Sequence, residues 1–159
     1  PDIFMIHLSE EVLYFFRKQG FTFVSTLNGE GTIHVACKDI VKVTEDGKIY
    51  LLDLYMGRTY RNLKERPVIS VTAADEHTFT GYCLKGKPKI IPREALDPKI
   101  INEWDKTITS RVTSRLLRNI RGEKGHSAHP EALLPKPKYM IMVEVDEVID
   151  LTPRHLKKA

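Results

Sequence analysis

Five strand-like runs follow one another between residues 21 and 91, and short turns separate them. Two of these turns, Asn28-Gly29 and Asp46-Gly47, are among the strongest short hairpin signals that a sequence can carry. The runs cover residues 21–27, 32–43, 48–54, 68–73 and 77–91. Strands spaced this closely predict an antiparallel sheet in meander order. Because closing such a sheet removes its exposed edges, we expect a closed or nearly closed barrel.

Helical patterns flank this region. Ser9 is placed to cap a short helix that ends near Gln19. A long helix is predicted over residues 98–121, with a buried apolar stripe at helical spacing. The stripe consists of Ile101, Trp104, Ile108, Val112, Leu116 and Ile120. A last strand over residues 139–149 completes a mainly β fold, and we expect residues 1–159 to form one domain.

The bulk composition is ordinary for a globular protein, with 42% hydrophobic and 29% charged residues. The formal charge of +4 suits phosphorylated ligands or nucleic acid, and it equally suits a solvated surface of mixed charge. Cys37 and Cys83 are too few for a disulfide framework or a metal quartet, which favours free thiols in a reducing compartment. We find no leader and no membrane-spanning run, so we expect a cytoplasmic protein outside the membrane.

A short basic turn lies between the third and fourth strand-like runs. Gly57 permits close backbone approach, Arg58 and Arg61 supply positive charge, and Thr59 supplies a hydroxyl. Guanidinium groups and free backbone amides are the donors that a phosphate monoester requires. The alternative is that Gly57 merely ends a strand and that both arginines face water.

The order of these pieces resembles the FMN-binding split-barrel family, which includes the pyridoxamine phosphate oxidases. The resemblance spans about residues 21–91. It rests on a Leu-Asn-Gly hairpin, Ile33-His34-Val35-Ala36, Asp-Gly-Lys-Ile-Tyr-Leu-Leu, Gly-Arg-Thr-Tyr-Arg-Asn-Leu, Arg66-Pro67-Val68-Ile69-Ser70-Val71 and Leu84-Lys85-Gly86-Lys87. It implies a six-stranded antiparallel Greek-key split barrel that binds FMN as a homodimer, with the flavin at the subunit interface.

The resemblance also implies roles for individual residues. The second strand, with His34, Val35, Ala36 and Cys37, would lie along the flavin ring, and Leu52 and Asp53 would approach the ring or the ribityl chain. The phosphate would fall to Gly57, Arg58 and Thr59, with Arg61 and Lys38 adding charge. Family members often have lysine where Thr59 stands, so this chain departs from the pattern there. The C-terminal arginine-histidine signature of true pyridoxamine phosphate oxidases is also missing, which disfavours vitamin B6 as the substrate.

The implied activity is that of a flavin-dependent oxidoreductase acting on an unknown small molecule, or of a flavin protein without known turnover. No catalytic side chain is assigned, because a flavin itself performs hydride or electron transfer. The same barrel could instead hold a deazaflavin or haem. A nucleic-acid-binding barrel is a weaker alternative.

Two further groups of residues have a plain interpretation. Arg111, Arg115, Arg118 and Arg121 form a row on the long helix that we interpret as a solvated face, with an anionic partner as the alternative. His126 and His129 lack the additional ligands of a metal site, and we interpret them as surface residues.

Overall fold

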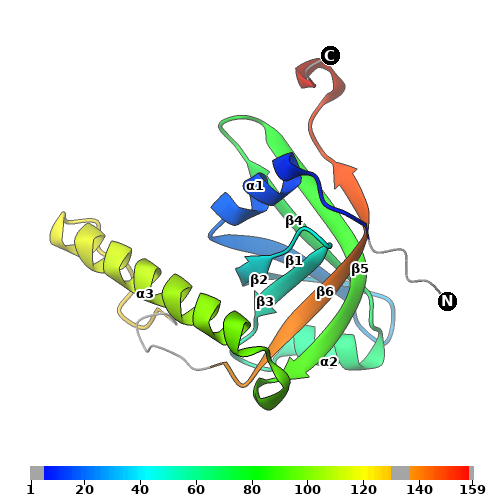
Figure 1. Ribbon diagram of the computed structural model, residues 1–159, viewed down its shortest axis with the longest axis horizontal. Helices are drawn as coiled ribbons and strands as arrows, with labels where there is room; N and C mark the ends of the chain where they lie inside the picture. The colour runs from blue at the N-terminus through cyan, green and yellow to red at the C-terminus, as the bar shows by residue number, and fades with distance from the viewer. Residues whose placement is uncertain (1–5, 130–136, 158–159) are drawn as a thin grey trace.

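The computed structural model describes residues 6–129 and 137–157, and its centre is a closed barrel of antiparallel strands (Figure 1). The strands are β1 (Phe21–Leu27), β2 (Ile33–Val43), β3 (Lys48–Leu52), β4 (Ile69–Asp75), β5 (Thr80–Pro92) and β6 (Tyr139–Asp150). The α-helices are α1 (Glu10–Lys18), α2 (Arg58–Glu65) and α3 (Pro98–Ile120), with short 3-10 turns η1 (Arg93–Ala95) and η3 (Arg154–Leu156). The prediction of a mainly β, six-stranded antiparallel barrel with flanking helices is confirmed.

The strands follow the order β1-β2-β3-β6-β5-β4 around the barrel. The predicted simple meander is therefore wrong at one point, because β3 pairs with β6 while β4 pairs with β1. The connection from β3 to β4 contains α2, which packs against β1 and β2. This crossover brings the end of β3 and the start of β6 together at one end of the barrel.

The local turn signals are largely confirmed. The first hairpin loop spans five residues rather than a tight Asn-Gly pair, and Gly31 takes the left-handed conformation with φ 82°. The Asn28 side chain stabilises this loop by accepting hydrogen bonds from the backbone N–H groups of Glu30 and Thr32. Gly86 marks a register shift between β5 and β6, where an added Cβ would lie 2.1 Å from the Glu144 carbonyl oxygen.

The helix α3 has two halves with different surroundings. Its first half covers the outer face of the barrel, and its second half projects beyond the barrel (Figure 1). The first half and the sheet form a core cluster separate from the barrel interior. Its buried members are Val41, Leu52, Leu96, Ile100, Trp104, Ile108 and Met140.

The predicted stripe on α3 is buried only at its start. Trp104 and Ile108 are 5% and 6% exposed, whereas Leu116 and Ile120 are 57% and 82% exposed. A helix turns about 100° per residue, so a row at four-residue spacing rotates by about 40° at each step. The row therefore winds from the inner side of α3 at Trp104 to the outer side at Ile120, and the prediction was wrong for its second half. Among the described residues, no helix has the length and apolar character needed to span a bilayer.

Candidate cofactor site

A buried charge network lies where β2, β3 and β6 meet. Asp53 follows β3 and is 1% exposed. The Lys38 ammonium donates to Oδ1 of Asp53 at 2.9 Å, and the Tyr139 hydroxyl donates to Oδ2. The Tyr55 backbone N–H also lies 3.4 Å from Oδ1. Because a carboxylate without partners is costly to bury, these donors are what allow Asp53 to lie inside the protein.

Tyr139 is the fixed end of this network. It is 4% exposed, and the ring of Tyr60 from α2 packs edge-on against it with 5.2 Å between centroids. Burial, with the Asp53 hydrogen bond as the next cause, raises the pKa of the Tyr139 hydroxyl far above its usual range. Tyr139 therefore keeps its proton and acts as a hydrogen-bond donor to Asp53.

The turn after β3 leads to an open helix N-terminus. Gly57 is the N-cap of α2, and no side chain in the described part of the chain caps the helix there. The first backbone N–H groups of a helix have no acceptor within the helix, and its dipole favours an anion at this end. Arg58 and Arg61 are exposed beside the turn, and an added Cβ on Gly57 would meet nothing within 4 Å. Thr59, the third side chain predicted to contact the phosphate, is buried, with 2% of its surface exposed.

The predicted residues of β2 divide between the two faces of the strand. Val35 and Cys37 are exposed on the outer face, whereas His34, Ala36 and Lys38 alternate with them and are half-buried. This alternation follows from the two-residue period of a strand. Only part of the predicted set can therefore contact any one ligand through its side chains.

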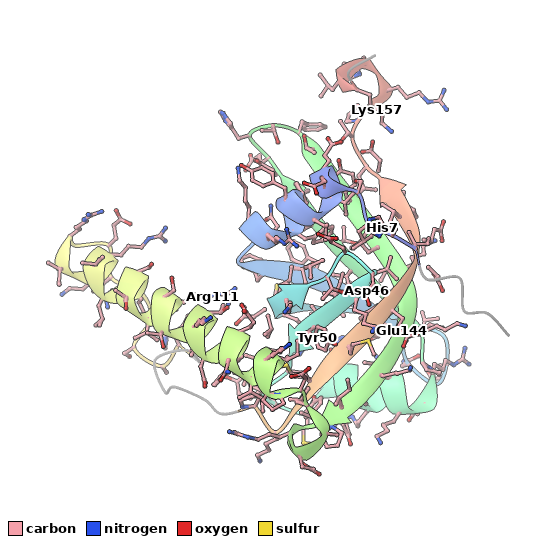
Figure 2. All side chains as sticks on the ribbon, viewed as in Figure 1. His7, Asp46, Tyr50, Arg111, Glu144 and Lys157 are labelled. Atoms are coloured by element: carbon pink, nitrogen blue, oxygen red, sulfur yellow. The ribbon has the colours of Figure 1, made fainter. Side chains whose placement is uncertain are left out.

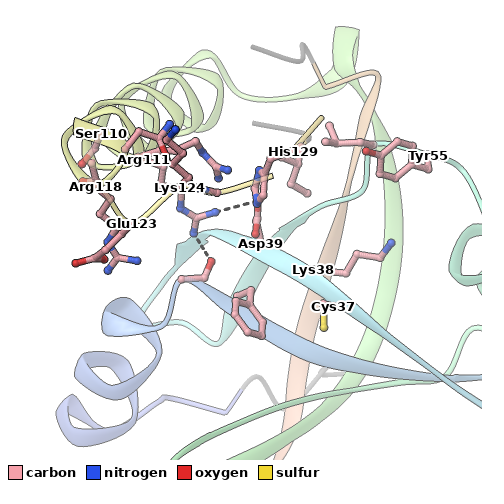
Figure 3. Close-up of a pocket in the computed structure, with 18 residues that line it drawn as sticks. Cys37, Lys38, Asp39, Tyr55, Ser110, Arg111, Arg118, Glu123, Lys124 and His129 are labelled. Carbon is pink, nitrogen blue, oxygen red and sulfur yellow. Dashed lines mark hydrogen bonds and ion pairs between the residues drawn. The ribbon is translucent and has the colours of Figure 1, made fainter. Parts of the chain in front are cut away.

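A cleft of about 900 Å³ separates the second half of α3 from the barrel (Figure 3). Of the predicted cofactor residues, Cys37, Lys38 and Leu52 line it. The predicted phosphate residues of the α2 turn do not line it. Tyr55 connects the two regions, because its side chain lines the cleft and its backbone contacts Asp53.

Three arginines of α3 turn toward this cleft. Arg111, Arg115 and Arg118 recur at spacings of four and three, which keeps them on the inner side of the helix. Figure 2 shows Arg111 on the side of α3 that faces the barrel. Arg111 forms an ion pair with Asp39 of β2 at 2.9 Å and donates to the Gly20 carbonyl (Figure 3). The interpretation was therefore wrong in placing these three opposite the core, although Arg118 is exposed to solvent.

In the second half of α3, polar residues therefore face the barrel and apolar residues face away from it, the reverse of the first half. Its inner side is basic, and Lys124 adds a further cation to the cleft lining. Among the described lining residues, the carboxylates are Asp39 and Glu123. Its outer side presents Leu116, Leu117 and Ile120, which are exposed. Such a distribution favours an anionic ligand on the inner side and a protein contact on the outer side.

Comparison with known proteins gives this barrel a family. The pyridoxamine 5'-phosphate oxidase family model matches residues 8–143, and the chain belongs to that family. Among curated proteins, none matches the chain.

Solved structures of low sequence identity share the fold of this chain. HupZ from Group A Streptococcus superposes with a TM-score of 0.61 at 16% identity, over 91% of this chain and 94% of its own. An FMN-binding protein from Syntrophomonas wolfei gives 0.57 at 11% identity, over 86% and 80% of the two chains. A protein described as F420 reductase gives 0.55 at 15% identity, over 91% and 98%.

Sequence reasoning missed two parts of the site. Tyr139 donates to a carboxylate 86 positions earlier, and no local pattern indicates that pairing. The inward arginines carried a detectable signal, because Arg111 lies at a spacing of seven from Trp104, on the buried side of the same helix. Among the described residues, no group of three or more His, Cys, Asp or Glu could hold a metal ion.

Proposed function

We propose that this protein is an FMN-binding flavoprotein and an oxidoreductase that uses the flavin for hydride or electron transfer to a small substrate. The observation that carries the proposal is the uncapped N-terminus of α2, flanked by Arg58 and Arg61, on a barrel of this family. That donor set has the chemistry of a phosphate site. When bound, FMN supplies the redox chemistry, and the protein binds it and orients it.

The residues between the turn and the cleft fit the rest of the cofactor. Cys37, Lys38 and Leu52 line a cleft within the size range of small-molecule sites, and Tyr55 extends that lining toward α2. We place the flavin ring along β2 in this cleft and the phosphate at Gly57, Arg58 and Arg61. Thr59 is buried, so we assign the phosphate contacts of this turn to its backbone amides, Arg58 and Arg61.

The basic wall of the cleft supports an anionic substrate. Arg115, Arg118 and Lys124 lie across the cleft from β2, where a substrate beside the flavin ring would be held. A carboxylate or phosphate group on that substrate would be bound by charge-assisted hydrogen bonds from guanidinium groups.

Exposed apolar side chains support a homodimer. Phe21 and Phe23 of β1 and Ile33 and Val35 of β2 are between 48% and 70% exposed on one face of the sheet. Contiguous exposed apolar surface of this kind marks protein contacts. We assign this face to a second copy of the chain, with the flavin near the interface.

Removing the proposed phosphate ligands tests the cofactor assignment. Hydrogen bonds to charged groups contribute about 1.5–3 kcal/mol, so Arg58→Ala and Arg61→Ala should each weaken FMN binding by roughly 10- to 150-fold. Lys64→Ala is the matched control, since Lys64 is exposed in the last turn of α2 and should leave the affinity unchanged. Equal affinities for all three variants, measured by quenching of flavin fluorescence, would remove the phosphate from this turn.

A deazaflavin is the second candidate, because one structural neighbour is described as F420 reductase. The absorption spectrum of the purified protein separates the cofactors. A two-banded flavin spectrum supports FMN. A single deazaflavin band would instead assign a deazaflavin as the cofactor, and a Soret band would assign haem.

A further inference from the structure

We infer that Asp53 and Tyr139 are positioning residues that fix the Lys38 ammonium at the floor of the cleft. The Lys38 ammonium and the Asp53 carboxylate, as a pair of opposite charges, then set the redox potential of the flavin. The inference rests on the proposed function, because it requires a flavin ring beside β2. The Asp53 carboxylate is buried, and neither phosphate binding at the α2 turn nor substrate binding by the arginines of α3 accounts for it.

Lys38 has hydrogen-bonding capacity that the described residues do not use. Its side chain is 13% exposed and lines the cleft. An ammonium group has three N–H donors, and Asp53 Oδ1 is the only acceptor that the described residues give it. The remaining donors are left for an acceptor in the cleft.

The orientation of Lys38 is fixed from behind. A lysine side chain is flexible, and an exposed ion pair would not hold it in one place. Asp53 is instead 1% exposed, and the Tyr139 hydroxyl and Tyr55 N–H restrain its carboxylate. The ring of Tyr60 packs against Tyr139 in turn. The ammonium therefore has a defined position relative to β2, which a preorganised electrostatic group requires.

Charge near a flavin ring shifts its potential in a predictable direction. Addition of two electrons and one proton makes the neutral ring an anion, so a nearby cation favours the reduced form and a nearby carboxylate opposes it. Lys38 should raise the potential, and Asp53 should offset part of that increase. Removing one charge and removing the other should therefore shift the potential in opposite directions.

The test is a reductive titration of flavin-loaded variants against a reference dye. We expect Lys38→Met to weaken binding of reduced relative to oxidised flavin about tenfold, which lowers the midpoint by about 30 mV for a two-electron couple. Asp53→Asn should raise the midpoint by a similar amount. Lys38→Arg keeps the charge and should retain most of the potential.

Further variants keep the test decisive if removing one charge impairs folding. Lys38→Met combined with Asp53→Asn removes both charges and should return the midpoint close to the wild-type value. Tyr139→Phe leaves both charges in place and removes only the restraint on Asp53, so a shift toward the Lys38→Met value supports positioning.

The possible failures are distinguishable. Wild-type protein that takes up no flavin would overturn the proposed function and this inference with it. Bound flavin whose potential is the same in every variant, or moves in one direction for both single charge removals, would overturn only the inference. A wild-type potential in Tyr139→Phe would remove Tyr139 from the positioning role.

Discussion

The same substitution should destabilise the protein in the first half of α3 and leave its stability nearly unchanged in the second half. Ile108 is 6% exposed in the cluster between α3 and the sheet, whereas Ile120 is 82% exposed twelve positions later. Replacing a buried isoleucine by alanine costs about 2–5 kcal/mol through lost burial and the cavity left behind. For a chain of this size, each kcal/mol lowers the melting temperature by about 2–4 °C. Ile108→Ala should therefore lower it by roughly 4–20 °C.

Ile120→Ala is the matched control. It removes the same atoms from the same helix, and at an exposed position the change should stay within about 0.5 kcal/mol. Thermal and urea unfolding should be measured at a protein concentration at which light scattering shows monomers, because a second copy could cover the outer side of α3. Equal destabilisation by the two substitutions under those conditions would refute the winding of the apolar row from the inner to the outer side.

Other predictions concern the barrel and the attachment of α3. Gly86→Ala should lower the unfolding free energy by about 1–3 kcal/mol, because the added Cβ would overlap the facing carbonyl of β6. Gly20→Ala is the control and should leave the unfolding free energy unchanged, because a Cβ there has no atom within 4 Å. Equal unfolding free energies for the two variants would contradict the close approach at Gly86. Burial, with nearby carboxylates, raises the pKa of Tyr82 to about 12. Protonated Tyr82 therefore contributes to the free energy of unfolding in full below pH 10, and this contribution is lost as pH rises toward 12. Ultraviolet titration should show two tyrosines that ionise late, Tyr82 near pH 12 and Tyr139 at still higher pH. Tyr82→Phe should remove only the transition near pH 12, and persistence of that transition would reject the assignment. Arg111→Met should speed hydrogen exchange in residues 111–120 while Arg121→Met does not, and identical exchange would mean that the ion pair does not hold α3.

Local features of the fold were predictable because their causes lie within a few residues. Ser9 caps α1 by accepting from the Val12 N–H at 3.3 Å, as its position before two glutamates indicates. Gly86 marks the irregularity in β5, since a side chain there has no room against β6. The strand at residues 21–27 also has the bounds that its alternation predicts.

Features that depend on distant pairing were not predictable in the same way. Hairpin signals specify that β2 pairs with β1 and with β3, but nothing local specifies that β3 pairs with β6 or that β4 pairs with β1. The charge network has the same origin, because Lys38, Asp53 and Tyr139 meet only after that pairing forms. The burial of the second half of the apolar row on α3 was predicted wrongly for another reason. The four-residue spacing of the row does not match the roughly 3.6-residue repeat of the helix.

The most direct measurement compares the affinities of this protein for FMN and for riboflavin, which has the same ring and ribityl chain without the phosphate. If the α2 turn binds the phosphate through its amides, Arg58 and Arg61, riboflavin should bind at least about 100-fold more weakly than FMN, corresponding to roughly 3 kcal/mol or more. Equal affinities, or binding of neither compound, would contradict the assignment of the turn.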